Sequence, residues 1–215
     1  MQKYCYLLLL FTFSSISFAQ LSVQVNDMNN NKLSNIVVEL KFNDPNFEAP
    51  AALRENTMQQ VDQQFIPHIL AIQKGEVVHF PDTDTVQHHV YSFSKARTFE
   101  IAIYQKEVSR KINFDAPGIV ELGCNIHDWM LGYIYVAESP LYTKTNDSGE
   151  AIFKSLPSGP IEVNVWHPRL SENDIKKTYF IQAANTQPTL HITLSEPLLP
   201  SYADFDDIHG VGEYE

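Results

Sequence analysis

Short runs in which apolar and polar residues alternate recur along this chain, and they restrict its fold more than any other sequence feature. Examples are LSVQV (21–25), EVVHF (76–80), IVELG (119–123) and IEVNVW (161–166), with Gly, Pro, Asn and Asp between such runs. Because successive side chains of a strand point to opposite faces, these runs indicate half-buried strands. Helical periodicity is weak throughout, so the sequence predicts an all-β fold of sandwiches with short antiparallel strands.

The first residues have the pattern of a secretory signal. Lys3 precedes an apolar run, and the small residues Ser17 and Ala19 stand at positions −3 and −1 of a cleavage site. We therefore expect residues 1–19 to be removed by cleavage after Ala19, and the mature protein to be periplasmic or secreted. The apolar run is too short to cross a bilayer about 30 Å thick, and no transmembrane segment is expected. An uncleaved anchor is the alternative.

The chain is acidic, with a formal net charge of −11 at pH 7. Phosphate backbones repel such a surface, so no nucleic acid partner is expected. The same charge favours basic protein partners, although acidity can also serve solubility alone.

Only one thiol remains after the signal is removed. Cys5 lies within the signal, and Cys124 is the other cysteine of the chain. No intramolecular disulfide is then possible. A lone exported cysteine is buried and inert, pairs between molecules, reacts, or binds a metal.

The sequence GCNIHDWMLGYIYV (123–136) supplies two further metal-binding side chains close to this cysteine. Cys124, His127 and Met130 have the spacing C-x2-H-x2-M in a loop between two predicted strands. Such a loop lets three side chains converge. Thiolate and imidazole together suit copper, and a thioether is the long axial ligand of a blue copper site. Zinc fits less well, because methionine is a poor zinc ligand.

A second imidazole must come from elsewhere, and FPDTDTVQHHVYSF (80–93) offers His88 and His89. Neighbouring side chains of a strand point to opposite faces, so only one of the two can face a buried site. The residues themselves leave the choice open.

These segments resemble the plastocyanin, pseudoazurin and amicyanin group of cupredoxins. In that group a strand of the form G-x-x-V-x-F-x-N-x-D precedes H-N-V and, much later, the Cys, His, Met loop. The matching residues here are Gly75, Val78, Phe80, Asp82, Asp84, His88, His89 and Val90. The resemblance makes His88 the ligand and puts His89 where the family has Asn. It implies one type 1 (blue) copper per chain, held by His88, Cys124, His127 and Met130.

The resemblance also implies a function. A blue copper protein carries single electrons between redox partners, so we expect an electron carrier and no enzyme. The expected partner is a redox protein, for which a cytochrome or a dehydrogenase is a candidate. The alternative is a copper-binding or copper-delivery protein, or a module that binds a protein or glycan, without redox turnover.

The predicted copper ligands end one block of the chain. Residues 52–138 are expected to form a cupredoxin Greek-key sandwich. The flanking segments 20–45 and 139–195 resemble the carboxypeptidase regulatory-like, transthyretin-like sandwich, into which the cupredoxin is inserted or to which it is fused. The last residues, 196–215, are acidic and are expected to form a loose tail.

The N-terminal segment allows two interpretations. Residues 23–42, with an Asn-rich middle, are expected to form a hairpin. The simpler alternative is that residues 21–42 supply the first strands of the copper domain, which leaves a small separate domain at the C-terminus.

Several aromatic residues are given structural roles. We expect Tyr91, Phe93, Phe99 and Tyr104 to pack in a core. Ile126 and Trp129 flank His127 and are expected to form an apolar rim at which a partner docks. The alternative for Trp129 is to pack beneath the loop.

Overall fold

Strands make up nearly all of the regular structure in the part of the chain that is described. The computed structural model describes residues 20–49, 56–103, 110–175, 177–182 and 189–201. The predicted all-β class is confirmed. Among these residues no helix has the length and apolar character needed to cross a bilayer. The predicted signal, residues 1–19, lies outside them.

The strands and the short helix follow one another in this order: β1 (Leu21–Asn26), β2 (Val37–Phe42), β3 (Gln59–Val61), β4 (Gln64–Ile66), β5 (Ile69–Gln73), β6 (Val77–Phe80), β7 (Val90–Ser94), β8 (Arg97–Ile101), β9 (Arg110–Asn113), β10 (Gly118–Cys124), β11 (His127–Ala137), β12 (Tyr142–Lys144), β13 (Glu150–Phe153), β14 (Pro160–Trp166), α1 (Glu172–Ile175), β15 (Thr178–Gln182) and β16 (Thr189–Thr193).

Strands β3–β11 form one sandwich, which we call the inserted sandwich. Its main sheet has the order β5-β11-β10-β7-β8, and the pairs β6-β9 and β3-β4 complete it. Alternation decides which side chains point inward: on β10, Val120, Leu122 and Cys124 are buried, whereas Glu121 is exposed. Cys124 therefore points toward the same core as Leu122, because residues two apart share a face.

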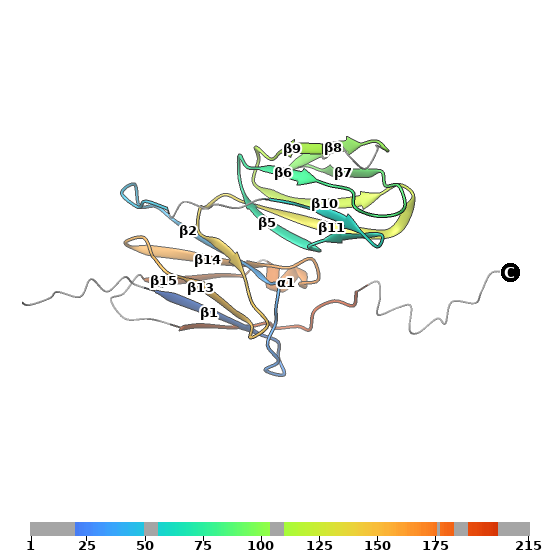
Figure 1. Ribbon diagram of the computed structural model, residues 1–215. Helices are drawn as coiled ribbons and strands as arrows, with labels where there is room; N and C mark the ends of the chain where they lie inside the picture. The colour runs from blue at the N-terminus through green and yellow to red at the C-terminus, as the bar shows by residue number, and fades with distance from the viewer. Residues whose placement is uncertain (1–19, 50–55, 104–109, 176, 183–188, 202–215) are drawn as a thin grey trace, which may run out of the picture.

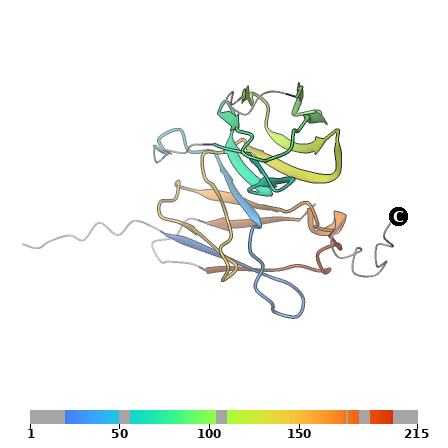
Figure 2. The same ribbon diagram turned by 45° about the vertical axis from the view of Figure 1, so that its right-hand side comes forward.

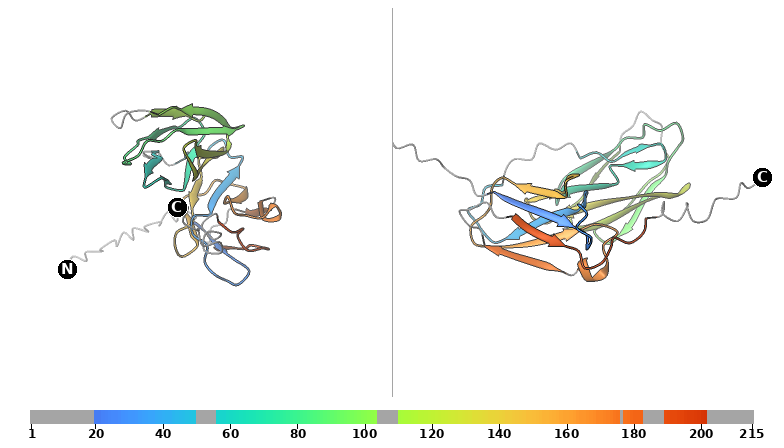
Figure 3. Two further views of the ribbon diagram at one scale, coloured as in Figure 1. Left: turned by 90° about the vertical axis from the view of Figure 1, so that its right-hand side faces the viewer. Right: turned by 90° about the horizontal axis from the view of Figure 1, so that it is seen from below.

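The remaining strands, β1, β2 and β12–β16, form the split sandwich around a separate hydrophobic core. Its sheets have the orders β13-β1-β16 and β12-β2-β14-β15. The view from below in Figure 3 shows β1 beside β16, so the two ends of the described chain meet in one sheet.

The predicted hairpin of residues 23–42 is wrong, because β1 and β2 lie in different sheets. Four consecutive residues of β2, Val37 to Leu40, are buried. A hairpin with one face in solvent would leave every second side chain of this strand exposed, whereas β2 is covered on both faces. Val38 and Leu40 face the core of the split sandwich, which leaves Val37 and Glu39 on the opposite face.

That opposite face lies against the inserted sandwich. The chain leaves the split sandwich after β2 and returns to it as β12, which pairs with β2. Figures 1 and 2 show the green and yellow strands of the inserted sandwich stacked on the blue and orange strands of the split one. The expected domain limits stay predictions, and residue 52 lies outside the described residues.

A buried carboxylate joins the two sandwiches. Glu39 on β2 is 2% exposed. It accepts hydrogen bonds from Tyr135 Oη (2.6 Å) and from the backbone N–H groups of Glu138 (2.8 Å) and Ser139 (2.7 Å). Buried polar groups are stable only when their hydrogen bonds are made, and here all three donors belong to β11 or to the segment that follows it.

Aromatic packing reinforces this contact. Trp166, at the end of β14, has ring centroids 5.9 Å from Tyr133 and 5.6 Å from Tyr135 on β11. In addition, Lys144 Nζ donates a hydrogen bond to the Ile69 carbonyl (2.8 Å). The outer face of β11 is thereby fixed against the split sandwich.

We expect Glu39→Ala to lower the free energy of unfolding by about 3 kcal/mol, because it leaves the half-buried Tyr135 hydroxyl and two N–H groups without their acceptor. Urea denaturation followed by tryptophan fluorescence measures the effect. Glu138→Ala is the matched control, since Glu138 pairs with Lys41 at the surface (3.2 Å) and its loss should cost less than about 1 kcal/mol. Equal losses in the two variants would contradict the role given to Glu39.

Candidate metal centre

Two adjacent strands position three of the four predicted ligands. Cys124 is the last residue of β10 and His127 is the first of β11, and the two are cross-strand partners across a tight turn. Met130 follows on β11 and is 2% exposed, as buried as Cys124 at 3%. Both belong to the core cluster of the inserted sandwich, so the ligand loop closes one end of this core.

The fourth residue arrives from the segment before β7. His88 is 1% exposed, and its Nδ1 lies 3.8 Å from Cys124 Sγ. His127 Nδ1 lies 3.6 Å from the same sulfur, and the two imidazole centroids are 5.0 Å apart. The structure therefore brings His88, Cys124 and His127 together, with one ring nitrogen of each histidine toward the thiol.

This spacing fits one metal ion. The candidate ligand atoms of His88, Cys124 and His127 all lie within 4.8 Å of one another. Nitrogen and sulfur atoms bound at about 2.0–2.3 Å to one ion lie about 3.5 Å apart, close to the two N–S distances found here. Met130 lines the same hollow as Cys124. The donor set, two imidazoles, one thiol and a neighbouring thioether, is compatible with one copper ion.

A carboxylate for which the sequence predicted no role contacts His88. Asp84 Oδ2 lies 3.0 Å from His88 Nε2 and accepts the backbone N–H of Gln63 (2.6 Å), while Oδ1 accepts that of Thr85 (2.6 Å). The Gln63 hydrogen bond is the main cause that lowers the pKa of Asp84 to about 2; burial opposes it, and Thr85 and His88 add to it. Asp84 is thus ionised at neutral pH.

An ionised carboxylate can only accept hydrogen bonds. His88 must therefore donate from Nε2, which leaves Nδ1, the nitrogen nearer Cys124, free to bind a metal. Metal-binding histidines are commonly oriented in this way by a carboxylate. The sequence signal was the acid four residues before the histidine, and it gained a meaning only once both side chains were seen to be buried.

His89 points elsewhere. Its Nε2 lies 2.7 Å from Glu100 Oε1, and its side chain is 21% exposed. Its carbonyl accepts the backbone N–H of Asn125 (3.0 Å) in the ligand turn. Both residues precede β7, and their side chains have separate partners: His88 contacts Asp84 and the Cys124 sulfur, whereas His89 contacts Glu100 and supports the turn through its backbone.

Apolar side chains surround the exposed side of the cluster. Ile126 is 45% and Trp129 57% exposed, and the Trp129 ring lies 5.6 Å from His127. Trp129 therefore does not pack beneath the loop. The two side chains form a rim around a half-buried histidine.

The predicted core role of the aromatic cluster is partly wrong. Phe99 does pack on Phe80 and Phe114. Phe93, however, is 82% exposed, because the inward positions of β7 are Val90 and Ser92. Tyr104 lies outside the described residues.

Comparisons with known proteins give structural similarity only. No protein-family model matches the chain, and no curated protein matches it. A reduced copper(I) form of an amicyanin variant is 17% identical, with a TM-score of 0.36, and the match covers 40% of this chain and 86% of that one. A purple cupredoxin from Nitrosopumilus maritimus is 18% identical, with a TM-score of 0.35 and coverages of 38% and 99%. The copper-containing nitrite reductase from Thermus scotoductus SA-01 is 24% identical, with a TM-score of 0.38, and the match covers 46% of this chain and 28% of that one.

We expect the copper-free protein to carry the His88 proton on Nε2, as the ionised Asp84 requires. In Asp84→Asn one carboxylate oxygen becomes an NH2 group, which cannot accept a hydrogen bond from Gln63, Thr85 or His88. His88 is then no longer held with its proton on Nε2. Long-range 1H–15N correlation spectra of the copper-free protein report the proton directly. Asp82→Asn is the control, since Asp82 accepts the backbone N–H of Asp84 (3.1 Å) and should leave His88 unchanged. A wild-type His88 protonated on Nδ1 would contradict the assignment.

Proposed function

We propose that the chain is an exported type 1 copper protein of the cupredoxin kind that carries single electrons between redox partners. The observation that carries this proposal is the convergence of His88 Nδ1 and His127 Nδ1 on the Cys124 thiol, beside a buried Met130. In the proposal, Cys124, His88 and His127 are the strong ligands and Met130 is the weak axial one. Bound copper would supply a one-electron couple between Cu(II) and Cu(I).

The proposed ligands are held in fixed positions by the surrounding structure, as electron transfer requires. Cys124 ends a buried strand, His88 is held by Asp84, and His127 is fixed at the start of β11. Ligands that keep their positions when the charge of the ion changes reduce the reorganisation that electron transfer requires. The Trp129 ring lies against His127 on the exposed side of the cluster.

No catalytic turnover is included in the proposal. Four protein ligands leave no open position for a substrate, unlike catalytic metal sites. A redox protein as partner and export by the segment 1–19 are also part of the proposal. They are supported by the acidic charge of −11 and by the signal-like sequence.

The copper-loaded protein should show an intense visible thiolate-to-copper band and a reversible one-electron wave. Cys124→Ser and His88→Ala should both abolish the band, because each removes a strong ligand, whereas His89→Ala should keep it. Absorption spectroscopy and voltammetry measure the two properties.

The His89 variant is the matched control for the His88 variant. A colourless Cu(II) protein would contradict the proposal. Transfer of copper to a metal-free acceptor protein, without a reversible redox wave, would favour copper delivery instead.

A further inference from the structure

A groove at the junction of the two sandwiches has no task in the proposed electron transfer. It encloses about 630 Å³, within the range of roughly 300–1,000 Å³ found for sites of small ligands. One wall is formed by β4, His68 and β11 of the inserted sandwich, and the other by residues 168–169 and 199–201 of the split sandwich. Figure 1 shows the two sandwiches stacked, and ligand sites are common between two such units.

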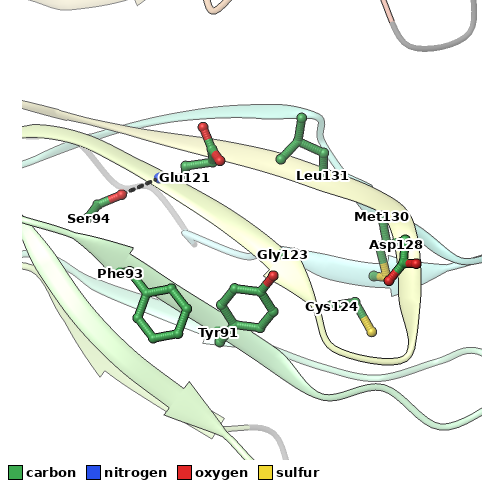
Figure 4. Close-up of a pocket in the computed structure, with 9 residues that line it drawn as sticks. All are labelled: Tyr91, Phe93, Ser94, Glu121, Gly123, Cys124, Asp128, Met130 and Leu131. Carbon is green, nitrogen blue, oxygen red and sulfur yellow. Dashed lines mark hydrogen bonds between the residues drawn. The ribbon is translucent and has the colours of Figure 1, made fainter.

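Apolar side chains make up much of the groove, which is separate from the hollow beside Cys124. Figure 4 shows that hollow, in which Leu131 is turned away from the cysteine. Leu131 and Tyr133 share the outer face of β11, because residues two apart point the same way, and both line the groove. Ile66 and Leu199 line it too, and they are 43% and 51% exposed. A ligand with an apolar part would cover these side chains.

The turn after β14 holds Arg169 at the groove. The Arg169 N–H donates to His167 Nδ1 (3.2 Å), the Leu170 N–H donates to the His167 carbonyl (3.1 Å), and the Arg169 carbonyl accepts the Leu199 N–H (2.7 Å). Burial is the main cause that lowers the pKa of His167 to about 4, and Arg169 and His68 add to it. His167 is therefore neutral at pH 7 and can accept the Arg169 N–H. The backbone on both sides of the arginine is thus fixed.

Positive charge prevails in the groove although the chain is acidic. The chain has 26 Asp and Glu against 15 Lys and Arg, yet none of these acids is among the described residues that line the groove. Desolvation is the main cause that lowers the pKa of His68, and the Leu131 carbonyl opposes it. The cations Arg169 and Lys144 lower this pKa further. Both cations therefore act on the same part of the groove.

We propose that this groove binds a small organic anion that has one carboxylate and an apolar body. The carboxylate would pair with Arg169, because a guanidinium offers several N–H donors in the planar arrangement that a carboxylate accepts. The apolar body would lie between Leu131 and Leu199. An inorganic anion would leave these apolar walls uncovered, and an uncharged apolar ligand would desolvate the guanidinium without a partner for it. The inference goes beyond the proposed function, since this binding needs no copper.

The test uses three probes of similar size: phenylpropionate, phenylpropanol and phenylpropylamine. The wild type should bind phenylpropionate at least about tenfold more tightly than phenylpropanol, because only the acid forms a charged hydrogen bond with Arg169. Phenylpropylamine should bind most weakly. Titration calorimetry measures the affinities, and the fluorescence of Trp129, which lines the groove, reports the place of binding.

Variants of Arg169 separate its charge from a role in folding. Arg169→Gln should bind phenylpropionate about tenfold more weakly, and Arg169→Glu should prefer phenylpropylamine to phenylpropionate. A damaged fold cannot produce such a reversal. Lys154→Gln is the matched control, because it removes one positive charge from an exposed residue of the split sandwich outside the groove. It should bind all three probes as the wild type does.

Equal affinity of the wild type for phenylpropionate and phenylpropanol would overturn the inference, as would equal losses in Arg169→Gln and Lys154→Gln. A chain shortened to end at Ser201 lacks the acidic residues 202–215. If phenylpropionate bound only to this shortened chain, the groove would belong to the chain's own carboxylates, which also overturns the inference. A colourless Cu(II) protein that binds phenylpropionate would retain the groove and lose the carrier. A blue, redox-active protein that does not bind it would retain the carrier and lose the groove.

Discussion

The arrangement of the molecule depends on the ladder between β10 and β11. One end of it sets Cys124 against His127. The inner face of β11 then contributes Met130, Ile134 and Val136 to the core, and its outer face presents Tyr135 to the buried Glu39 of the split sandwich. A single eleven-residue strand therefore carries candidate ligands, core residues and interface residues. A shift of the β11 register by one residue would turn the candidate ligands, the core residues and the interface residues to the opposite faces, because side chains alternate in a strand.

Local pattern was sufficient for the fold class and for the strand that leads to Cys124, but not for strand pairing. The alternation of 119–123 predicted a strand that ends at Gly123, and β10 runs one residue further, to Cys124. The hairpin of 23–42 failed because β2 buries both faces, one of them on a sandwich formed by later residues. Likewise, Trp166 could not be assigned to the contact with Tyr133 and Tyr135, since nothing local shows that β14 and β11 meet.

In the candidate site, too, some residues could be predicted from local sequence and others could not. The spacing of Cys124, His127 and Met130 was readable because the three are close in sequence, although the expected loop is mostly strand: β10 runs to Cys124 and β11 begins at His127. Choosing His88 over His89 needed the resemblance to a family, and their ligand roles stay predictions. Asp84 was seen only as part of a strand pattern. Its function as acceptor for His88 depends on the backbone N–H of Gln63, which arrives from another strand pair.

Because the side chains of the candidate site are buried, their hydrogen bonds and charges affect the stability of the fold as well as the proposed redox function. Asp84 is a buried anion, but the backbone groups of Gln63 and Thr85 and the imidazole of His88 satisfy it. Cys124 is equally buried, and its neighbours are two imidazoles that must be neutral to bind a metal. In our proposal a metal ion binds between these three side chains, whose candidate ligand atoms lie within 4.8 Å of one another. A cation that binds only the folded chain also stabilises it, so the site that serves electron transfer in our proposal would at the same time secure the open end of the inserted sandwich.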